Sequence, residues 1–211
     1  MMNHIYRLPL LMFAIAASGC VSLLPETSPP KPRYHITTPD SAALQGDHLS
    51  WSLVIDDPRT TRVYDSVRVA VAPSPGKIEY FAGAEWADRA PRLFQTTLVQ
   101  TFEDSGRILA VGDRGAVPVG DVVLQTDIRR MHYDVRNRAG QADIAIYARL
   151  GDGKGGVYAA RSFLASAPAI GESADEIIAA FNTAFQSLIP EMVVWTYEQG
   201  EAATAGANTS G

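Results

Sequence analysis

Residues 67–106 read VRVAVAPSPGKIEYFAGAEWADRAPRLFQTTLVQTFEDSG and predict a strand, a turn, a second strand and a helix. Every second residue from Val67 to Val71 is a valine, which is the period of a strand with one buried face. Two prolines and a glycine at residues 73–76 cannot continue a ladder of hydrogen bonds and therefore predict a turn. The alternation resumes at Ile78 and runs to Trp86, which predicts the second strand.

A helix is predicted directly after these strands. Proline is tolerated only in the first turn of a helix, so Pro91 places the helix start near residues 88–90. Gly106 supplies the stop, because glycine readily adopts the left-handed conformation that ends helices. The stripe expected to face the core has helical spacing and consists of Pro91, Phe94, Leu98, Thr101 and Phe102.

The run PSPGKIEYFAGAEWADRAPRLFQ, followed by FEDSGRILAV, resembles the ABC-type transport auxiliary lipoprotein family. This is the PqiC-like lipoprotein subunit of MCE-type envelope lipid transport systems. The resemblance extends over Tyr34 to Tyr197 and is most specific over Glu79 to Gln95. It implies a non-catalytic subunit that couples an MCE-domain protein and its ABC permease and ATPase to the opposite membrane, with phospholipid or another hydrophobic molecule as the cargo.

Residues 1–19 are interpreted as a lipoprotein signal peptide. The apolar run Leu8 to Ala17 is too short to cross a bilayer. It ends in Ala-Ser-Gly-Cys, and Cys20 is the only cysteine of the chain. This matches the bacterial lipobox, although leucine is commoner than alanine at position 17, and Cys20 is the predicted lipid attachment site. The alternative is an ordinary secretory signal with a chance cysteine.

Three acyl chains, palmitate among them, would anchor the protein durably, since each buried methylene contributes ~0.8 kcal/mol. Val21 is not the aspartate that commonly retains lipoproteins in the inner membrane, so the periplasmic face of the outer membrane is favoured. Residues 20–33 are the acylated cysteine and a proline-rich linker, which spans roughly 40 Å in the polyproline conformation. Residues 34–198 are the folded domain, and residues 199–211 are predicted to be a disordered tail.

The remaining elements indicate an α+β fold. Ser173 and Glu176 form a capping box at the start of a second helix. The strand over residues 122–135 turns polar towards its end, which predicts that this end leaves the core. The fold class is an antiparallel or mixed β-sheet with two main helices packed on one face. Further strands are predicted over residues 34–37, 50–56, 108–111, 142–150 and 157–166, the last two of which form an antiparallel meander with residues 122–135.

Composition and motifs argue against catalysis, cofactors and nucleic acid. The apolar fraction of 46% supports a sizeable core, and the net charge of −5 without a basic run disfavours nucleic acid. There is no Gly-x-Ser-x-Gly elbow, and acylation of Cys20 leaves no thiol nucleophile. The histidines show no paired spacing for a metal. Asp56 and Asp57 are adjacent, so they point apart and are interpreted as a solvated pair in a turn.

Aromatic and arginine side chains around the opening stretch give the best functional signal. Tyr80, Trp86, Arg89 and Arg92 are the predicted partner-binding residues, because aromatic residues and arginine are enriched in binding hot spots. The alternative for Trp86 is a place in the core between sheet and helix. The predicted partners are the MCE-domain protein and the ABC permease and ATPase, with self-association left open. The alternative function is a structural or regulatory outer-membrane lipoprotein that binds cell-wall machinery, and a lipoprotein hydrolase ranks last.

Overall fold

The computed structural model describes residues 30–136 and 140–208, with side chains as far as residue 205. Residues 31–211 form a compact unit separate from residues 1–30. The predicted signal peptide, Cys20 and most of the linker therefore lie outside the described residues.

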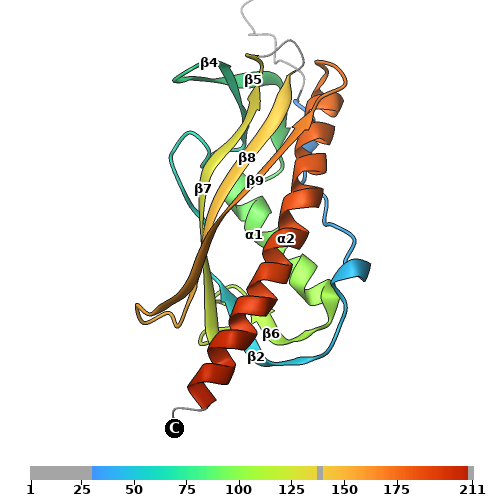
Figure 1. Cartoon of the computed structure of the whole chain (residues 1–211). Coiled ribbons are helices and arrows are strands. Elements are labelled where there is room, and N and C mark those ends of the chain that lie inside the picture. Colours follow the sequence, from blue (N-terminus) through green and yellow to red (C-terminus); the bar gives the residue numbers. More distant parts are fainter. Residues whose placement is uncertain (1–29, 137–139, 209–211) are drawn as a thin grey trace, which may run out of the picture. The chain divides into compact units, whose positions relative to one another are not determined.

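A long central strand organises the sheet (Figure 1). One edge of this strand, β7, pairs in succession with β2, β3 and β4, all parallel to it, while its other edge pairs with β8. Strands β7, β8 and β9 form the predicted antiparallel meander. The sheet is therefore mixed, and its strands are β1 (Arg33–Tyr34), β2 (Leu49–Ile55), β3 (Arg59–Thr60), β4 (Arg68–Ser74), β5 (Lys77–Trp86), β6 (Ile108–Gly112), β7 (Val122–Asp134), β8 (Gln141–Gly151) and β9 (Val157–Pro168).

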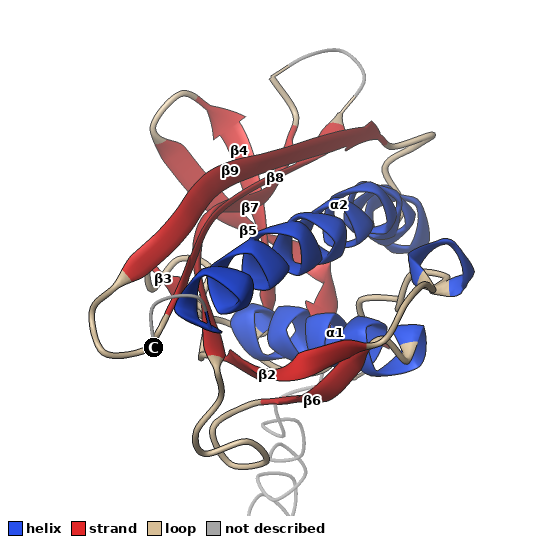
Figure 2. Ribbon diagram, turned by 60° about the horizontal axis from the view of Figure 1, so that its bottom comes forward, coloured by secondary structure: helices blue, strands red, loops and turns tan. Residues whose placement is uncertain are grey.

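Two helices pack on one face of the curved sheet, which confirms the predicted α+β class (Figure 2). Helix α1 (Ala90–Ser105) begins where Pro91 predicted and ends at Gly106, whose φ is +66°. All five residues of its predicted stripe are buried. Helix α2 (Ala174–Asn208) opens with the predicted capping box, in which the Ser173 backbone N–H donates to Glu176 Oε2 at 3.0 Å. A short 3-10 helix, η1 (Ala42–Leu44), precedes β2.

Aromatic pairs join α2 to the rest of the core. In each pair α2 supplies one ring, and β5, α1 or β9 supplies the other. Such pairs stabilise a core beyond the area that they bury. Helix α2 is long and apolar enough to cross a membrane by length and composition alone, but 56% of its most apolar window is buried inside the unit. The paired rings are Trp86 with Phe181, Phe94 with Phe185, Phe102 with Tyr197, and Phe163 with Trp195.

The far end of β7 does not leave the core, so that prediction was wrong. The pairing with β8 shifts register between Ile128 and Arg130, which marks a β-bulge. A bulge inserts one extra residue and reverses the alternation of the side chains. Met131 and Tyr133 therefore join the core, while His132 is buried on the opposite face. The polar residues on which that prediction was based lie in the bulge and on the buried polar face of β7 beyond it.

The predicted disordered tail is also wrong for residues 199–208, because α2 continues to Asn208. Gly200 is buried, and a Cβ atom at this position would lie 2.5 Å from the Trp51 ring. The close approach that glycine permits lets the helix pack on β2, so a tertiary contact extends it. Small differences elsewhere are that β1 covers only Arg33–Tyr34 and that β4 continues through Pro73.

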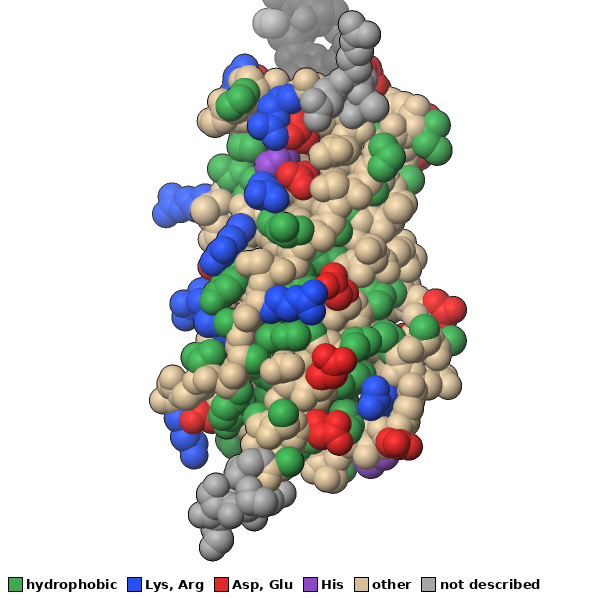
Figure 3. Space-filling view, in the orientation of Figure 1, with side chains coloured by type: hydrophobic (Ala, Val, Ile, Leu, Met, Phe, Trp, Pro, Cys, Tyr) green, Lys and Arg blue, Asp and Glu red, His purple; other side chains and the backbone are tan. Residues whose placement is uncertain are grey.

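The surface carries both signs of charge in different places. In the view of Figure 3, Lys and Arg side chains gather towards the left, where the sheet lies, and acidic side chains are more frequent towards α2. On the outer face of the sheet, the guanidinium groups of Arg129 and Arg149 lie 4.3 and 5.4 Å from the centroid of the Tyr147 ring. Such cation–π contacts hold the arginines against the sheet without neutralising them.

Candidate functional site

The structure separates the aromatic members of the predicted partner-binding set from its arginines. Trp86 is 2% exposed, and its ring lies edge-on to Phe181 at 5.3 Å between centroids. It therefore belongs to the core, which was the alternative for this residue. Tyr80 is half-buried, lies under the guanidinium of Arg68 at 3.6 Å, and donates a hydrogen bond to the Val63 carbonyl at 3.4 Å.

Arg89 and Arg92 lie together at the amino end of α1. Arg89 forms an ion pair with Asp65, and Arg92 Nη1 lies 3.6 Å from Asp113 Oδ2. Their side chains are 59% and 53% exposed, so each pair is solvated and available to a partner. The structure thus brings the two predicted arginines to one helix end.

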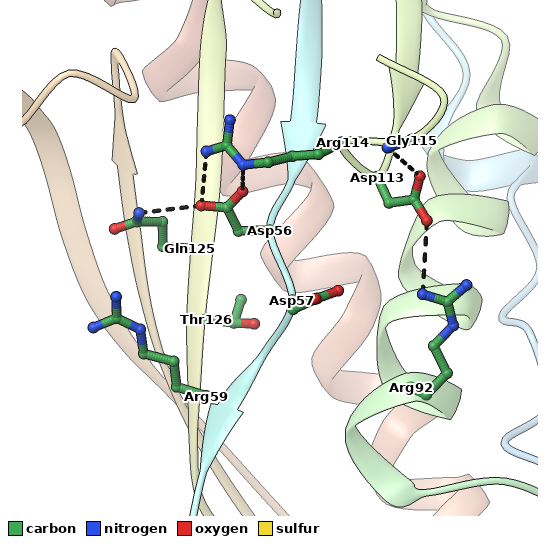
Figure 4. Close-up of a pocket in the computed structure, with 9 residues that line it drawn as sticks. All are labelled: Asp56, Asp57, Arg59, Arg92, Asp113, Arg114, Gly115, Gln125 and Thr126. Carbon is green, nitrogen blue, oxygen red and sulfur yellow. Dashed lines mark hydrogen bonds and ion pairs between the residues drawn. The ribbon is translucent and has the colours of Figure 1, made fainter. Parts of the chain in front are cut away.

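Arg92 also lines a polar pocket of about 400 Å³ (Figure 4). The pocket forms where the ladder beside β7 is interrupted. Ile55 pairs with Leu124 and Arg59 pairs with Asp127, so three residues on one side face two on the other. Pro58 lies in this gap and has no N–H group for the ladder. The lining residues are Asp56, Asp57, Arg59, Arg92, Asp113, Arg114, Gly115, Gln125 and Thr126.

Sheet topology explains why these distant residues meet. Strands β2 and β6 are parallel, and Val54 pairs with Gly112 at their carboxyl ends. The residues that follow each strand therefore emerge side by side, at the edge of the sheet where ligands commonly bind in open sheets of parallel strands. The amino end of α1 completes the pocket with Arg92.

Some charges of the pocket are paired with one another. Arg114 forms a bidentate ion pair with Asp56, with Nε at 2.6 Å from Oδ1 and Nη2 at 3.1 Å from Oδ2. Gln125 Nε2 donates a hydrogen bond to the same carboxylate at 3.2 Å. The hydrogen bond and the negative charge of Asp56 raise the pKa of Arg114 above its usual value. Asp56 is therefore held in an ion pair, which corrects the interpretation of Asp56 and Asp57 as a solvated pair.

Other groups of the pocket have no partner. Asp57 is exposed, and neither its side chain nor that of Arg59 makes a hydrogen bond or ion pair among the described residues. The Thr126 hydroxyl also has no hydrogen-bond partner in this part of the chain, although Thr126 is only 1% exposed. A buried hydroxyl without a partner is unfavourable, and this one belongs to a residue that lines the pocket.

A second polar cluster lies on β7 and β8, where possible metal-ligating atoms of His132, Asp134 and Asp143 lie within 4.8 Å of one another. The sequence predicted no metal site, and the register that places His132 opposite Asp143 cannot be read from spacing. Each member already has a protein partner: Tyr64 for His132 at 2.9 Å, Arg130 for Asp143 at 3.2 Å, and Arg136 for Asp134. We therefore treat the cluster as a charge-balanced network and not as a metal centre.

The pKa values in this network follow from burial and pairing. Burial lowers the pKa of His132, and the carboxylates of Asp143 and Asp134 act against that shift. The hydrogen bonds from Arg136 lower the pKa of Asp134 to about 2. Burial also raises the pKa of Tyr64. Burial thus favours the neutral form of His132, although it lies beside the carboxylates of Asp143 and Asp134.

The family model for the ABC-type transport auxiliary lipoprotein component matches residues 34–193. The crystal structure of XCC0632 from Xanthomonas campestris, a DUF330 protein, is 30% identical, covers 83% of this chain and 98% of its own, and has a TM-score of 0.72. A crystal structure of an uncharacterized protein, at 15% identity, covers 83% of this chain and 97% of its own with a TM-score of 0.57, a similarity of fold alone. The chain belongs to the family of ABC-type transport auxiliary lipoprotein components.

A relative in Bradyrhizobium diazoefficiens strain USDA 110, the uncharacterized protein bll6063, is 30% identical over 171 residues. The match covers 77% of this chain and 44% of the relative, so the chain spans less than half the length of this curated relative. The family is described as an auxiliary lipoprotein component of ABC-type transport.

Proposed function

We propose that the chain is a non-catalytic, lipid-anchored periplasmic subunit of an MCE-type ABC transporter that moves phospholipid or another hydrophobic molecule and supports envelope integrity. The observation that carries the proposal is the family match over residues 34–193, which spans nearly all of the folded unit. The resemblance of residues 73–95 to PqiC-like subunits supports the MCE-type partner. ATP hydrolysis then takes place on other chains.

The anchor of this subunit is the diacylated and N-acylated Cys20, on the periplasmic face of the outer membrane. The lipobox and the family description support this attachment. The proline-rich linker that follows would hold the folded unit away from the lipid surface. Its reach of roughly 40 Å lets the unit meet a partner that is not itself at the membrane surface.

The docking surface that we propose is the amino end of α1, with Arg89 and Arg92 as its charged contacts, and Tyr80 on β5 is proposed as a separate contact. Both arginines are more than half exposed, and an arginine fork binds a partner carboxylate in two places at once. Trp86 supports this surface from the core side through its contact with Phe181. The partner surface should therefore be acidic.

Affinity purification of the full chain from native membranes tests the proposal. We expect an ABC ATPase, its permease and an MCE-domain protein to be recovered together with the chain. Cys20→Ser is the control, because it removes the thioether and should release the chain from the membrane fraction. Recovery of cell-wall synthases without any transporter component would favour the alternative function instead, and mass spectrometry of an unmodified Cys20 would contradict the anchor.

A further inference from the structure

Three unpartnered groups meet in the polar pocket. Thr126 offers a buried hydroxyl, Asp57 a carboxylate and Arg59 a guanidinium group, and all three line the same cavity. In the view of Figure 4, Thr126 lies between Asp57 and Arg59. These two charged residues flank Pro58 and do not pair with each other, so the charges are held apart.

The rest of the pocket is electrically balanced. Asp56 is paired with Arg114, and Asp113 with Arg92, which leaves one negative and one positive group to interact with a ligand. The binding partner that satisfies both groups must carry both charges. An oxygen on that partner would accept a hydrogen bond from the hydroxyl of Thr126, which is the buried residue among the three.

We propose that this pocket binds a small zwitterion that carries an ammonium group and a phosphate or carboxylate group a few bonds apart. Arg59 binds the anionic group through its planar fork of donors. Asp57 binds the ammonium group, and Thr126 donates to an oxygen between them. The volume of about 400 Å³ lies within the range of small-ligand sites, roughly 300–1,000 Å³.

The lining excludes other classes of ligand. Six of the nine lining residues are charged, so an acyl chain in the pocket would have to take water away from ionised side chains. A simple anion would leave Asp57 unpaired beside a second negative charge. Amino-alkyl phosphates and amino acids fit both charges, and these occur as free molecules and, for phosphoethanolamine, as a lipid headgroup.

Calorimetric titration of the purified full chain in a nonionic detergent tests the proposal. The probes are O-phosphoethanolamine, glycerophosphoethanolamine and glycine, with inorganic phosphate and ethanolamine as the two half-ligands. We expect at least one zwitterion to bind about tenfold more tightly than either half-ligand, a difference of about 1.4 kcal/mol. Preference for the glycerophosphate diester would indicate a lipid headgroup, and preference for glycine or the monoester a free molecule.

Variants locate the binding in the pocket. Arg59→Gln and Asp57→Asn should each weaken binding about tenfold, since each removes one charge-assisted contact. Thr126→Val keeps the side-chain shape and should weaken binding about fivefold. It should not lower the unfolding temperature, because the hydroxyl that it removes has no hydrogen-bond partner among the described residues. Thr126→Ser should bind like the original chain, and Arg62→Gln, on an exposed residue outside the pocket, is the matched control.

Three results would overturn the proposal. Binding of inorganic phosphate as tightly as any zwitterion would show a simple anion site, and failure of every zwitterion to bind above the half-ligands would show that the pocket holds no such ligand. Equal weakening by Arg62→Gln would place the binding elsewhere. The purified chain is titrated without any transporter component. A failure to bind zwitterions would therefore not bear on the proposed transporter partnership, which affinity purification tests separately.

Discussion

The two faces of α1 differ in how completely their side chains are partnered. On the inner face, Phe94 is fully buried and its ring stacks on Phe185. On the outer face, Arg92 is half-exposed, holds one long ion pair, and borders a pocket with unpartnered groups. The difference shows that neighbouring residues of one sequence stretch have different roles. The aromatic residues stabilise the fold, and the arginines remain exposed and available for binding.

Removal of a ring from the inner face should have the largest effect on stability. Trp86→Ala deletes a ring that is 2% exposed and packs edge-on against Phe181, and we expect a loss of about 3–5 kcal/mol in the free energy of unfolding. Urea unfolding monitored by circular dichroism measures this loss. If the Trp86→Ala chain were as stable as the original but no longer bound its partner, Trp86 would be a partner-binding residue and not a core residue.

The next effect concerns the end of α2, where the structure replaces a predicted tail by a packed helix. Gly200→Ala places a methyl group against the Trp51 ring, and we expect a loss of about 1–3 kcal/mol from overpacking. At a free helical position the same change would stabilise the chain by up to about 1 kcal/mol. Thermal unfolding distinguishes the two, and an increase in the unfolding temperature would contradict the contact with Trp51.

A smaller, pH-dependent effect is expected in the charge network of β7. The pKa of Asp134 is about 2 in the folded chain, below its usual 3.8, so its ionised form stabilises the fold above pH 3.8. That contribution is lost as the pH falls from 3.8 to about 2. Asp134→Asn should therefore cost about 1–2 kcal/mol at pH 7 and flatten the acid limb of the stability curve. The exposed Asp88→Asn is the control, and an unchanged acid limb in Asp134→Asn would contradict the role of the pair with Arg136.

The sequence predicted the fold more completely than the site, for physical reasons that particular residues illustrate. Val69, Phe94 and Gly106 act through local period and backbone conformation, so their places could be predicted from neighbouring residues. The bulge before Met131 and the packing of Gly200 depend on strand pairing and on Trp51, which lies far away in sequence. The pocket depends on a break between β2 and β3 and on an arginine after β6, so no local pattern could indicate it.

The two predicted arginines illustrate the same limit from the functional side. The sequence predicts that Arg89 and Arg92 bind a partner together with Trp86, because aromatic residues and arginine are enriched in binding hot spots. Helical geometry keeps the arginines at one exposed end, but the strand period turns Trp86 into the core. This stretch therefore supplies both core and surface side chains, and partner binding by the two arginines stays a prediction.

The most direct test of the proposed function is affinity purification of the Arg92→Glu chain from native membranes, beside the original chain. We expect loss of the ABC permease, ATPase and MCE-domain protein, with an unfolding free energy within about 0.5 kcal/mol of the original, since exposed ion pairs contribute little to stability. Arg161→Glu is the matched control, because Arg161 is 47% exposed and also holds a single surface ion pair. Full recovery of the transporter components with Arg92→Glu, or equal loss with Arg161→Glu, would contradict docking at the amino end of α1.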